Sequence, residues 1–80
     1  MELTNLEFSV MRMLMTAAGD VVTRADLART IWGLSARDAS RSIDVCISGL
    51  RRKFGGTEAR PLYIETIRGV GFRLAPTPLN

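Results

Sequence analysis

The residues best suited to chemistry are arginines, which make up ten of the eleven basic residues and gather toward the second half of the chain. Residues 1–40 carry a net charge of −1, whereas residues 41–80 carry +4. The planar guanidinium group matches the geometry of phosphate groups and of guanine edges. This charge asymmetry predicts an anionic polymer as the partner, since a need for solubility alone would not place the charge in one half.

Catalytic and metal-binding chemistry has little support in the composition. Cys46 is the single cysteine and there is no histidine, so one chain can form neither an internal disulfide, a His/Cys metal site nor a histidine-based catalytic triad. The eight carboxylates are spread along the chain. We therefore expect no enzymatic activity and no cofactor.

Length and hydropathy predict one small domain of cytoplasmic location. The chain has 80 residues, 46% of them hydrophobic, which is close to the lower limit for a core that holds a chain together unaided. The longest apolar runs are three residues, whereas a membrane span needs about 20, and no signal-peptide layout is found at the N-terminus. We expect a domain over residues 1–75 and a flexible C-terminal tail over residues 76–80, where Pro76 and Pro78 lie.

Two helices are predicted in the first half. Thr4 and Glu7 have the spacing of a capping box, and the apolar residues behind them predict a helix over about 5–18. A second apolar stripe of Phe8, Met11 and Met15 indicates a helix covered on two sides. Thr23 and Asp26 begin the next helix, over about 24–32.

A third helix is predicted over residues 40–54, after a loop at 34–39 and with Asp38 or Ser40 as its cap. Its apolar residues Ile43, Ile47, Leu50 and Phe54 form one clean stripe. The opposite face is basic at both ends and small and polar in the middle, and Cys46 lies at the edge of the stripe. That face comprises Arg41, Ser42, Val45, Ser48, Gly49, Arg52 and Lys53.

The C-terminal part predicts a β-hairpin with a cationic tip. Residues 62–67 are β-branched and aromatic, residues 72–74 alternate, and the two flank Arg68-Gly69-Val70-Gly71. The glycines allow a tight turn that presents Arg68 outward. Three helices followed by a hairpin give a mainly α, α+β fold, the winged helix-turn-helix, whose third helix fits the major groove of DNA. Four of the five aromatic residues, Phe8, Trp32, Phe54 and Phe72, are predicted to lie in the core.

Specific motifs extend this pattern to a family. The chain resembles the OmpR/PhoB-type DNA-binding domain of bacterial response regulators over residues 3–74. The motifs that carry the resemblance are Leu3-Thr4-x-x-Glu7-Phe8, Val22-Thr23-Arg24-x-x-Leu27, Ile31-Trp32-Gly33, Arg41-Ser42-Ile43-Asp44-Val45, Leu50-Arg51-Arg52-Lys53-Phe54 and Ile64-x-Thr66-Ile67-Arg68-Gly69-Val70-Gly71-Phe72-Arg73-Leu74.

The resemblance implies promoter binding and transcriptional regulation, often by two copies on direct repeats and under the control of a receiver domain. It places helix 40–54 in the major groove, Arg68 in the minor groove and residues 33–39 against RNA polymerase. The family usually has a small sheet before its first helix, a histidine at position 46 and basic residues at 48 and 49, whereas this chain starts at the helix and has Cys46, Ser48 and Gly49. The expected DNA contacts are Arg41, Ser42, Val45, Cys46, Ser48, Gly49, Arg51, Arg52, Thr66 and Arg68.

Other interpretations of these residues stay open. Arg41 could pair with Asp44, the cations at 51–53 could complement the helix dipole, and Ser42, Val45 and Ser48 could form an ordinary polar face. At the level of function, the alternative is a winged-helix module that contacts RNA polymerase or a partner regulator. RNA binding is less favoured, because no aromatic platform for bases is found.

Overall fold

The computed structural model describes residues 2–54 and 63–75. The helices are α1 (Asn5–Thr16), α2 (Arg24–Leu27), the π-helical turn η1 (Ala28–Trp32) and α3 (Ala36–Lys53). The strands are β1 (Val22–Thr23), β2 (Ile64–Ile67) and β3 (Gly71–Leu74). α2 and η1 are continuous, so three helical segments precede the antiparallel hairpin, which confirms the predicted winged-helix fold. The sequence also predicts a helix end at Gly55-Gly56 and a turn at 60–61. These two features and the tail over 76–80 lie outside the described residues.

The helices begin where side-chain caps satisfy free backbone N–H groups. Thr4, Thr23 and Ser35 each accept a hydrogen bond from the backbone N–H three residues on, at 3.1, 3.0 and 3.1 Å. The third cap corrects the prediction for α3, which begins at Ala36 and not at 40. Residues 36–39, which were expected in a loop over 34–39, therefore form the first turn of α3. This turn presents Arg37 to solvent.

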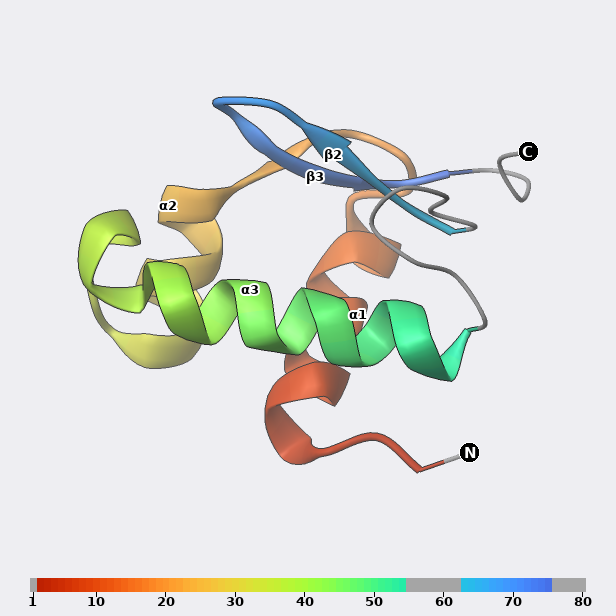
Figure 1. Ribbon diagram of the computed structural model, residues 1–80. Helices are drawn as coiled ribbons and strands as arrows, with labels where there is room; N and C mark the ends of the chain where they lie inside the picture. The colour runs from red at the N-terminus through yellow and green to blue at the C-terminus, as the bar shows by residue number, and fades with distance from the viewer. Residues whose placement is uncertain (1, 55–62, 76–80) are drawn as a thin grey trace.

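The sheet has a third strand, β1, which the sequence pattern did not predict. β1 pairs antiparallel with β3 through Val22–Phe72 and Thr23–Gly71, so β3 lies between β1 and β2. Figure 1 shows the hairpin above α3, with α1 crossing behind that helix. The hairpin is therefore tied to the start of α2, and the backbone N–H of Arg24 also donates to Val70 O near the hairpin tip at 3.2 Å.

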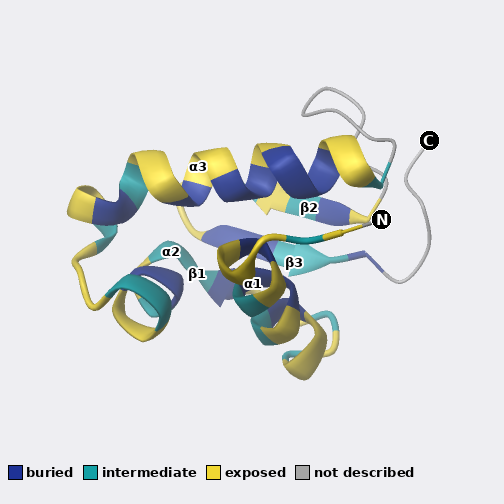
Figure 2. Ribbon diagram, turned by 90° about the horizontal axis from the view of Figure 1, so that it is seen from below, coloured by how far each residue is buried: buried dark blue, intermediate teal, exposed yellow. Residues whose placement is uncertain are grey.

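The core lies where α3, α1 and the sheet meet. Side chains from every layer are fully buried there, which fixes α3 by hydrophobic packing: Val10, Leu14, Leu27, Ile43, Ile47, Leu50 and Ile64. In Figure 2 the buried side of α3 faces the sheet and α1, and its outer side is exposed. No helix in the described ranges is long and apolar enough to span a bilayer.

The second apolar stripe of α1 is buried at Met11 but exposed at both ends, so the prediction of a helix covered on two sides is wrong for Phe8 and Met15. Phe8 is 58% exposed and Met15 is 62% exposed, whereas Val10 and Leu14 are buried. Of the four aromatic residues expected in the core, Phe72 is buried, and Trp32 and Phe54 are partly buried against the core. The reason is that the described part of the chain packs on one side of α1.

A buried carboxylate joins the start of α1 to the end of α3. Glu7 Oε1 accepts hydrogen bonds from the backbone N–H of Thr4, at 2.9 Å, and from Lys53 Nζ. A Cβ at Gly49 would overlap Glu7 Oε2, so the glycine makes room for this carboxylate. The hydrogen bond from Lys53 is the main cause that lowers the pKa of Glu7, and the Thr4 backbone lowers it further.

Glu7→Gln is expected to lower the free energy of unfolding at pH 7 by about 1–2 kcal/mol, because the capping box and the ion pair are both weakened. The folded-state pKa of Glu7 lies below that of the unfolded chain. The stabilisation by its carboxylate is therefore complete above about pH 4.5, and it is lost as the pH falls through the folded-state pKa. Urea denaturation of both proteins at pH 7 and in acid should show the difference shrinking in acid.

Glu2→Gln, at an exposed position, is the matched control and should change stability little. A constant difference between the Glu7 variant and the wild type across this pH range would contradict a role for the charge.

Candidate nucleic-acid interface

The outer face of α3 presents basic side chains at its ends and neutral ones in its middle. Exposed residues recur every three or four positions along the helix: Arg37, Arg41, Val45, Ser48 and Arg52. These five residues line a shallow groove on the surface together with Asp38, Ser40 and Asp44. Ser42 is also exposed. The structure thus brings five of the predicted contacts onto one helix face, namely Arg41, Ser42, Val45, Ser48 and Arg52.

The acidic residue in the middle of this face is held by an arginine from another helix. Asp44 Oδ1 lies 3.0 Å from Arg24 Nη1, and Arg24 Nη2 also donates to the carbonyl and the hydroxyl of Ser40, at 3.1 and 3.0 Å. The Arg24 guanidinium lies 5.5 Å from the centre of the Phe72 ring. One side chain thus joins α2, α3 and β3. Arg24 was assigned no role from the sequence, since its partners lie 16 or more residues away.

Three of the predicted contacts are buried. Cys46 is 6% exposed, and burial, assisted by the Glu7 charge, raises the pKa of its thiol. Gly49 packs against Glu7 and does not lie on the outer face. Arg51 is 6% exposed. The placement of Gly49 on the outer face and of Arg51 at the surface is therefore corrected, because α3 turns these positions toward α1 and β2.

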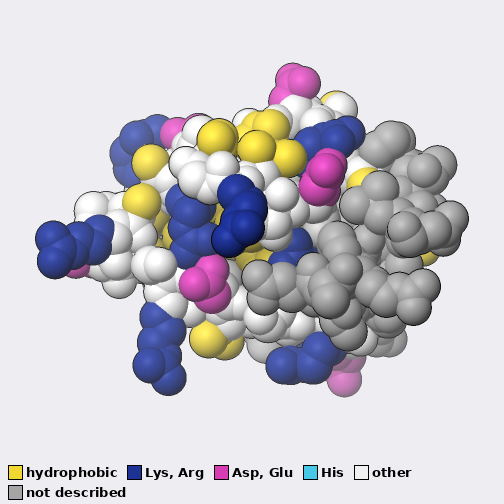
Figure 3. All heavy atoms as spheres, turned by 45° about the horizontal axis from the view of Figure 1, so that its top comes forward, with side chains coloured by type: hydrophobic (Ala, Val, Ile, Leu, Met, Phe, Trp, Pro, Cys, Tyr) yellow, Lys and Arg dark blue, Asp and Glu magenta, His cyan; other side chains and the backbone are white. Residues whose placement is uncertain are grey.

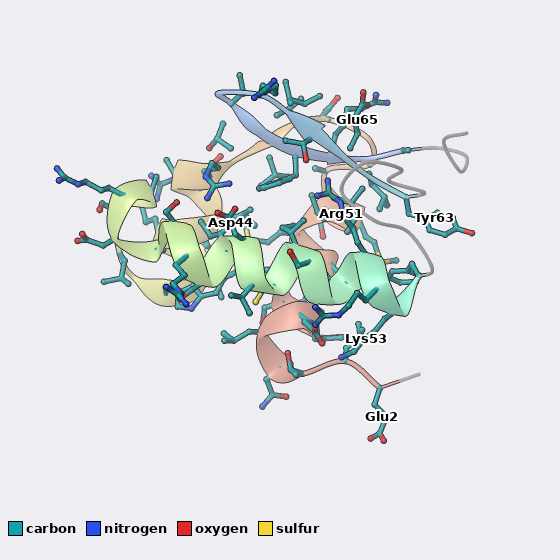
Figure 4. The ribbon with its side chains drawn as sticks, in the orientation of Figure 1. Glu2, Asp44, Arg51, Lys53, Tyr63 and Glu65 are labelled. Atoms are coloured by element: carbon teal, nitrogen blue, oxygen red, sulfur yellow. The ribbon has the colours of Figure 1, made fainter. Side chains whose placement is uncertain are left out.

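Arg51 extends from α3 toward the hairpin and not toward solvent (Figure 4). Its Nη2 donates to the backbone carbonyl of Ile64 at 2.9 Å and to Thr66 Oγ1 at 2.6 Å. Both acceptors belong to β2, one a backbone carbonyl and the other the side-chain hydroxyl two residues on. Arg51 therefore joins α3 to the hairpin.

The hairpin tip projects the remaining candidate cation. Arg68 is exposed in a turn closed by the Val70 N–H donating to Ile67 O at 2.9 Å. Gly69 has φ +74°, a conformation that few other residues adopt without strain. The glycine turn therefore presents Arg68 outward, as predicted from the sequence.

α3 and the hairpin meet at a narrow cavity of about 220 Å³. Ser48 from α3 and Thr66 from β2 line this cavity together with Arg24, Asp44 and Arg51. Figure 3, in which the top of Figure 1 is turned forward, shows basic side chains distributed over the described part of the surface, with acidic ones between them. Among the described residues, no group of three potential metal ligands was found. The arrangement is suited to binding anionic groups along α3 and at the hairpin.

Comparison with known proteins decides the family. The family model described as "Transcriptional regulatory protein, C terminal" matches residues 1–74. The chain belongs to this family. It is an OmpR/PhoB-type winged-helix domain of transcription regulators.

Individual relatives agree with this assignment. The chain is 38% identical over 80 residues to the alkaline phosphatase synthesis transcriptional regulatory protein PhoP of Bacillus subtilis. The match covers all of this chain and only 33% of PhoP. The chain therefore spans about a third of the length of that relative.

Solved structures of OmpR/PhoB-type domains share the fold. The Klebsiella pneumoniae RstA DNA-binding domain, in complex with the RstA box, has a TM-score of 0.84 and 33% identity, over 94% of this chain and 74% of that one. The DNA-binding domain of Bacillus subtilis CssR has a TM-score of 0.74 and 30% identity, over 92% of this chain and 78% of that one.

Proposed function

We propose that this domain binds double-stranded DNA and thereby regulates transcription, with α3 in the major groove and Arg68 in the minor groove. The observation that carries the proposal is the outer face of α3, where Arg37, Arg41 and Arg52 surround the neutral residues Val45 and Ser48. An α-helix fits the major groove, whose two edges are lined by phosphates. Family membership and the RstA complex with its DNA box support the proposal.

In this arrangement the cations provide affinity and the neutral residues provide limited base recognition. Arg41 and Arg52 contact phosphates on either side of the groove, and Arg37 extends the basic surface by one turn. Ser42 and Ser48 can bond to most bases, and Val45, which is 62% exposed, can contact a thymine methyl group. None of the three discriminates as strongly as a bidentate arginine.

The wing adds recognition of DNA shape. A guanidinium at a narrow turn can enter the minor groove, where A·T-rich sequence narrows the groove and strengthens its negative potential. Arg68 occupies such a turn. We therefore expect the preferred operator to contain an A·T-rich segment at the edge contacted by the wing. Cys46 and Gly49 are not proposed as base contacts, because both are buried.

Assembly and partners beyond DNA are further proposals. Binding as two copies on direct repeats would raise the affinity of a domain that by itself buries limited surface. The segment over 33–39 offers the exposed residues Gly33, Leu34 and Ser35 to RNA polymerase. The alternative function, a protein-interaction module, draws support from the exposed Phe8 and Met15 on α1.

Selection of sites from a random duplex pool, followed by titration at several salt concentrations, tests the function directly. If Arg37, Arg41, Arg52 and Arg68 neutralise three to four phosphates, log K should fall with log salt at a slope of roughly −3 to −4. The selected sites should share an A·T-rich segment.

An affinity that does not change with salt would contradict the proposal. Failure to enrich any duplex, together with binding to RNA polymerase or a partner regulator, would favour the alternative.

A further inference from the structure

Arg51 occupies a place where it can act on DNA through another residue. Its Nη2 donates to Ile64 O at 2.9 Å and to Thr66 Oγ1 at 2.6 Å, and the residue is buried between α3 and β2. Thr66, in contrast, is exposed. A direct contact between the Arg51 guanidinium and a phosphate at the surface is therefore disfavoured by its position.

The hydrogen bond from Arg51 determines what the Thr66 hydroxyl can do. A hydroxyl has one proton to donate and two lone pairs that accept. Because one lone pair receives the Arg51 proton, the Thr66 O–H must point in another direction. Within residues 2–54 and 63–75, the structure shows no hydrogen bond that the Thr66 hydroxyl donates. A hydroxyl that accepts from a cation is also a stronger donor, since successive hydrogen bonds polarise one another.

The surroundings of Thr66 fit one oxygen-rich anion. Thr66 and Ser48 line the same cavity between α3 and the hairpin, so two hydroxyls from different elements lie where α3 and the wing meet. The backbone of Thr66 is held by its antiparallel pairing with Phe72 in the central strand. The direction of the Thr66 hydroxyl then depends on its side-chain torsions, and the hydrogen bond from Arg51 can restrict them.

We propose that Arg51 is a positioning residue that directs the Thr66 hydroxyl proton toward a DNA phosphate lying between α3 and the wing. The inference rests on the proposed DNA binding and assigns to Arg51 an indirect role in it. It explains why an arginine at the end of the recognition helix is buried while its neighbour Arg52 is exposed.

The test is a double-mutant cycle on a selected duplex, with Arg51→Gln, Thr66→Val and the double variant. Thr66→Val should weaken binding about 10-fold, as expected for losing a hydrogen bond to a charged group, whereas Thr66→Ser should bind nearly as well as the wild type. Arg51→Gln should weaken binding by up to about 10-fold. The double variant should lose no more than the larger single loss, because both changes remove one contact.

Salt dependence separates this role from a direct contact. Arg51→Gln should leave the slope of log K against log salt unchanged, whereas Arg52→Gln, the matched control next to it, should reduce the slope by about 0.9. Losses at 51 and 66 that add, together with a reduced slope for Arg51→Gln, would show that Arg51 contacts phosphate itself and would overturn the proposal.

A measurement on the free wild-type protein needs no variant that could fail to fold. Three-bond scalar couplings should show Thr66 in a single χ1 rotamer, and in folded Arg51→Gln the couplings should become averaged. Rotamer averaging in the wild type would overturn the proposal. A wild type that binds no duplex would instead contradict the proposed function, while the Thr66 couplings would still report on the Arg51 contact.

Discussion

Gly71→Ala is expected to lower the free energy of unfolding by about 3 kcal/mol, the upper part of the range for overpacking. Gly71 begins the central strand β3 and pairs with Thr23 of β1. A Cβ at this position would overlap the carbonyl oxygen of Val22 and lie 2.8 Å from Thr23 Cα. Both obstacles are backbone atoms, so no side-chain rotation relieves the clash and β1 would have to separate from β3.

Urea denaturation measures this loss, and Gly33→Ala is its control. Gly33 has φ +67° but no atoms within 4 Å of an added Cβ, so alanine there should cost only about 1–2 kcal/mol of backbone strain. Equal losses for the two variants would show that the close approach of β1 to β3 does not explain the glycine. We also expect Gly71→Ala to weaken DNA binding, because the hairpin that carries Arg68 is anchored through β3.

Replacing Arg41 and Arg52 together by alanine is expected to weaken duplex binding about 100-fold, which assumes about 1.4 kcal/mol for each charged contact. The two residues lie on the exposed face of α3, at either end of Val45 and Ser48. The slope of log K against log salt should become shallower by about 1.8, because two phosphate contacts are lost. Fluorescence anisotropy at several salt concentrations gives both quantities.

The matched control is the double variant Arg12→Ala/Arg29→Ala. It has the same net charge as the first double variant, and its residues are exposed together in the groove between α1 and η1. Its effect on binding should be small, since long-range attraction alone is screened at physiological salt. Equal losses for the two double variants would mean that net charge, and not the face of α3, attracts DNA.

Elements defined by neighbouring residues were predictable from the sequence. Capping pairs such as Thr4 with Glu7 and the apolar stripe of Ile43, Ile47 and Leu50 act within a few residues. Local spacing therefore predicted a helix over 5–18, found over 5–16, a helix over 24–32, and the core side of α3. The start of α3 could also have been predicted from neighbouring residues. Ser35 and Asp38 repeat the spacing of Thr23 and Asp26, and this signal could have identified Arg37 as a residue of the recognition helix.

What the sequence by itself determined is therefore the order of helices and hairpin, the basic charge of the second half and the exposed turn that carries Arg68. Only the tertiary structure decided that β1 pairs with β3, that Phe8 is exposed, and that Arg51 faces β2 while Arg52 faces outward. The two arginines are adjacent and chemically identical, so no local rule distinguishes them. Their roles differ because burial and hydrogen bonding depend on strands that are distant in the sequence and that fold against only one side of the helix.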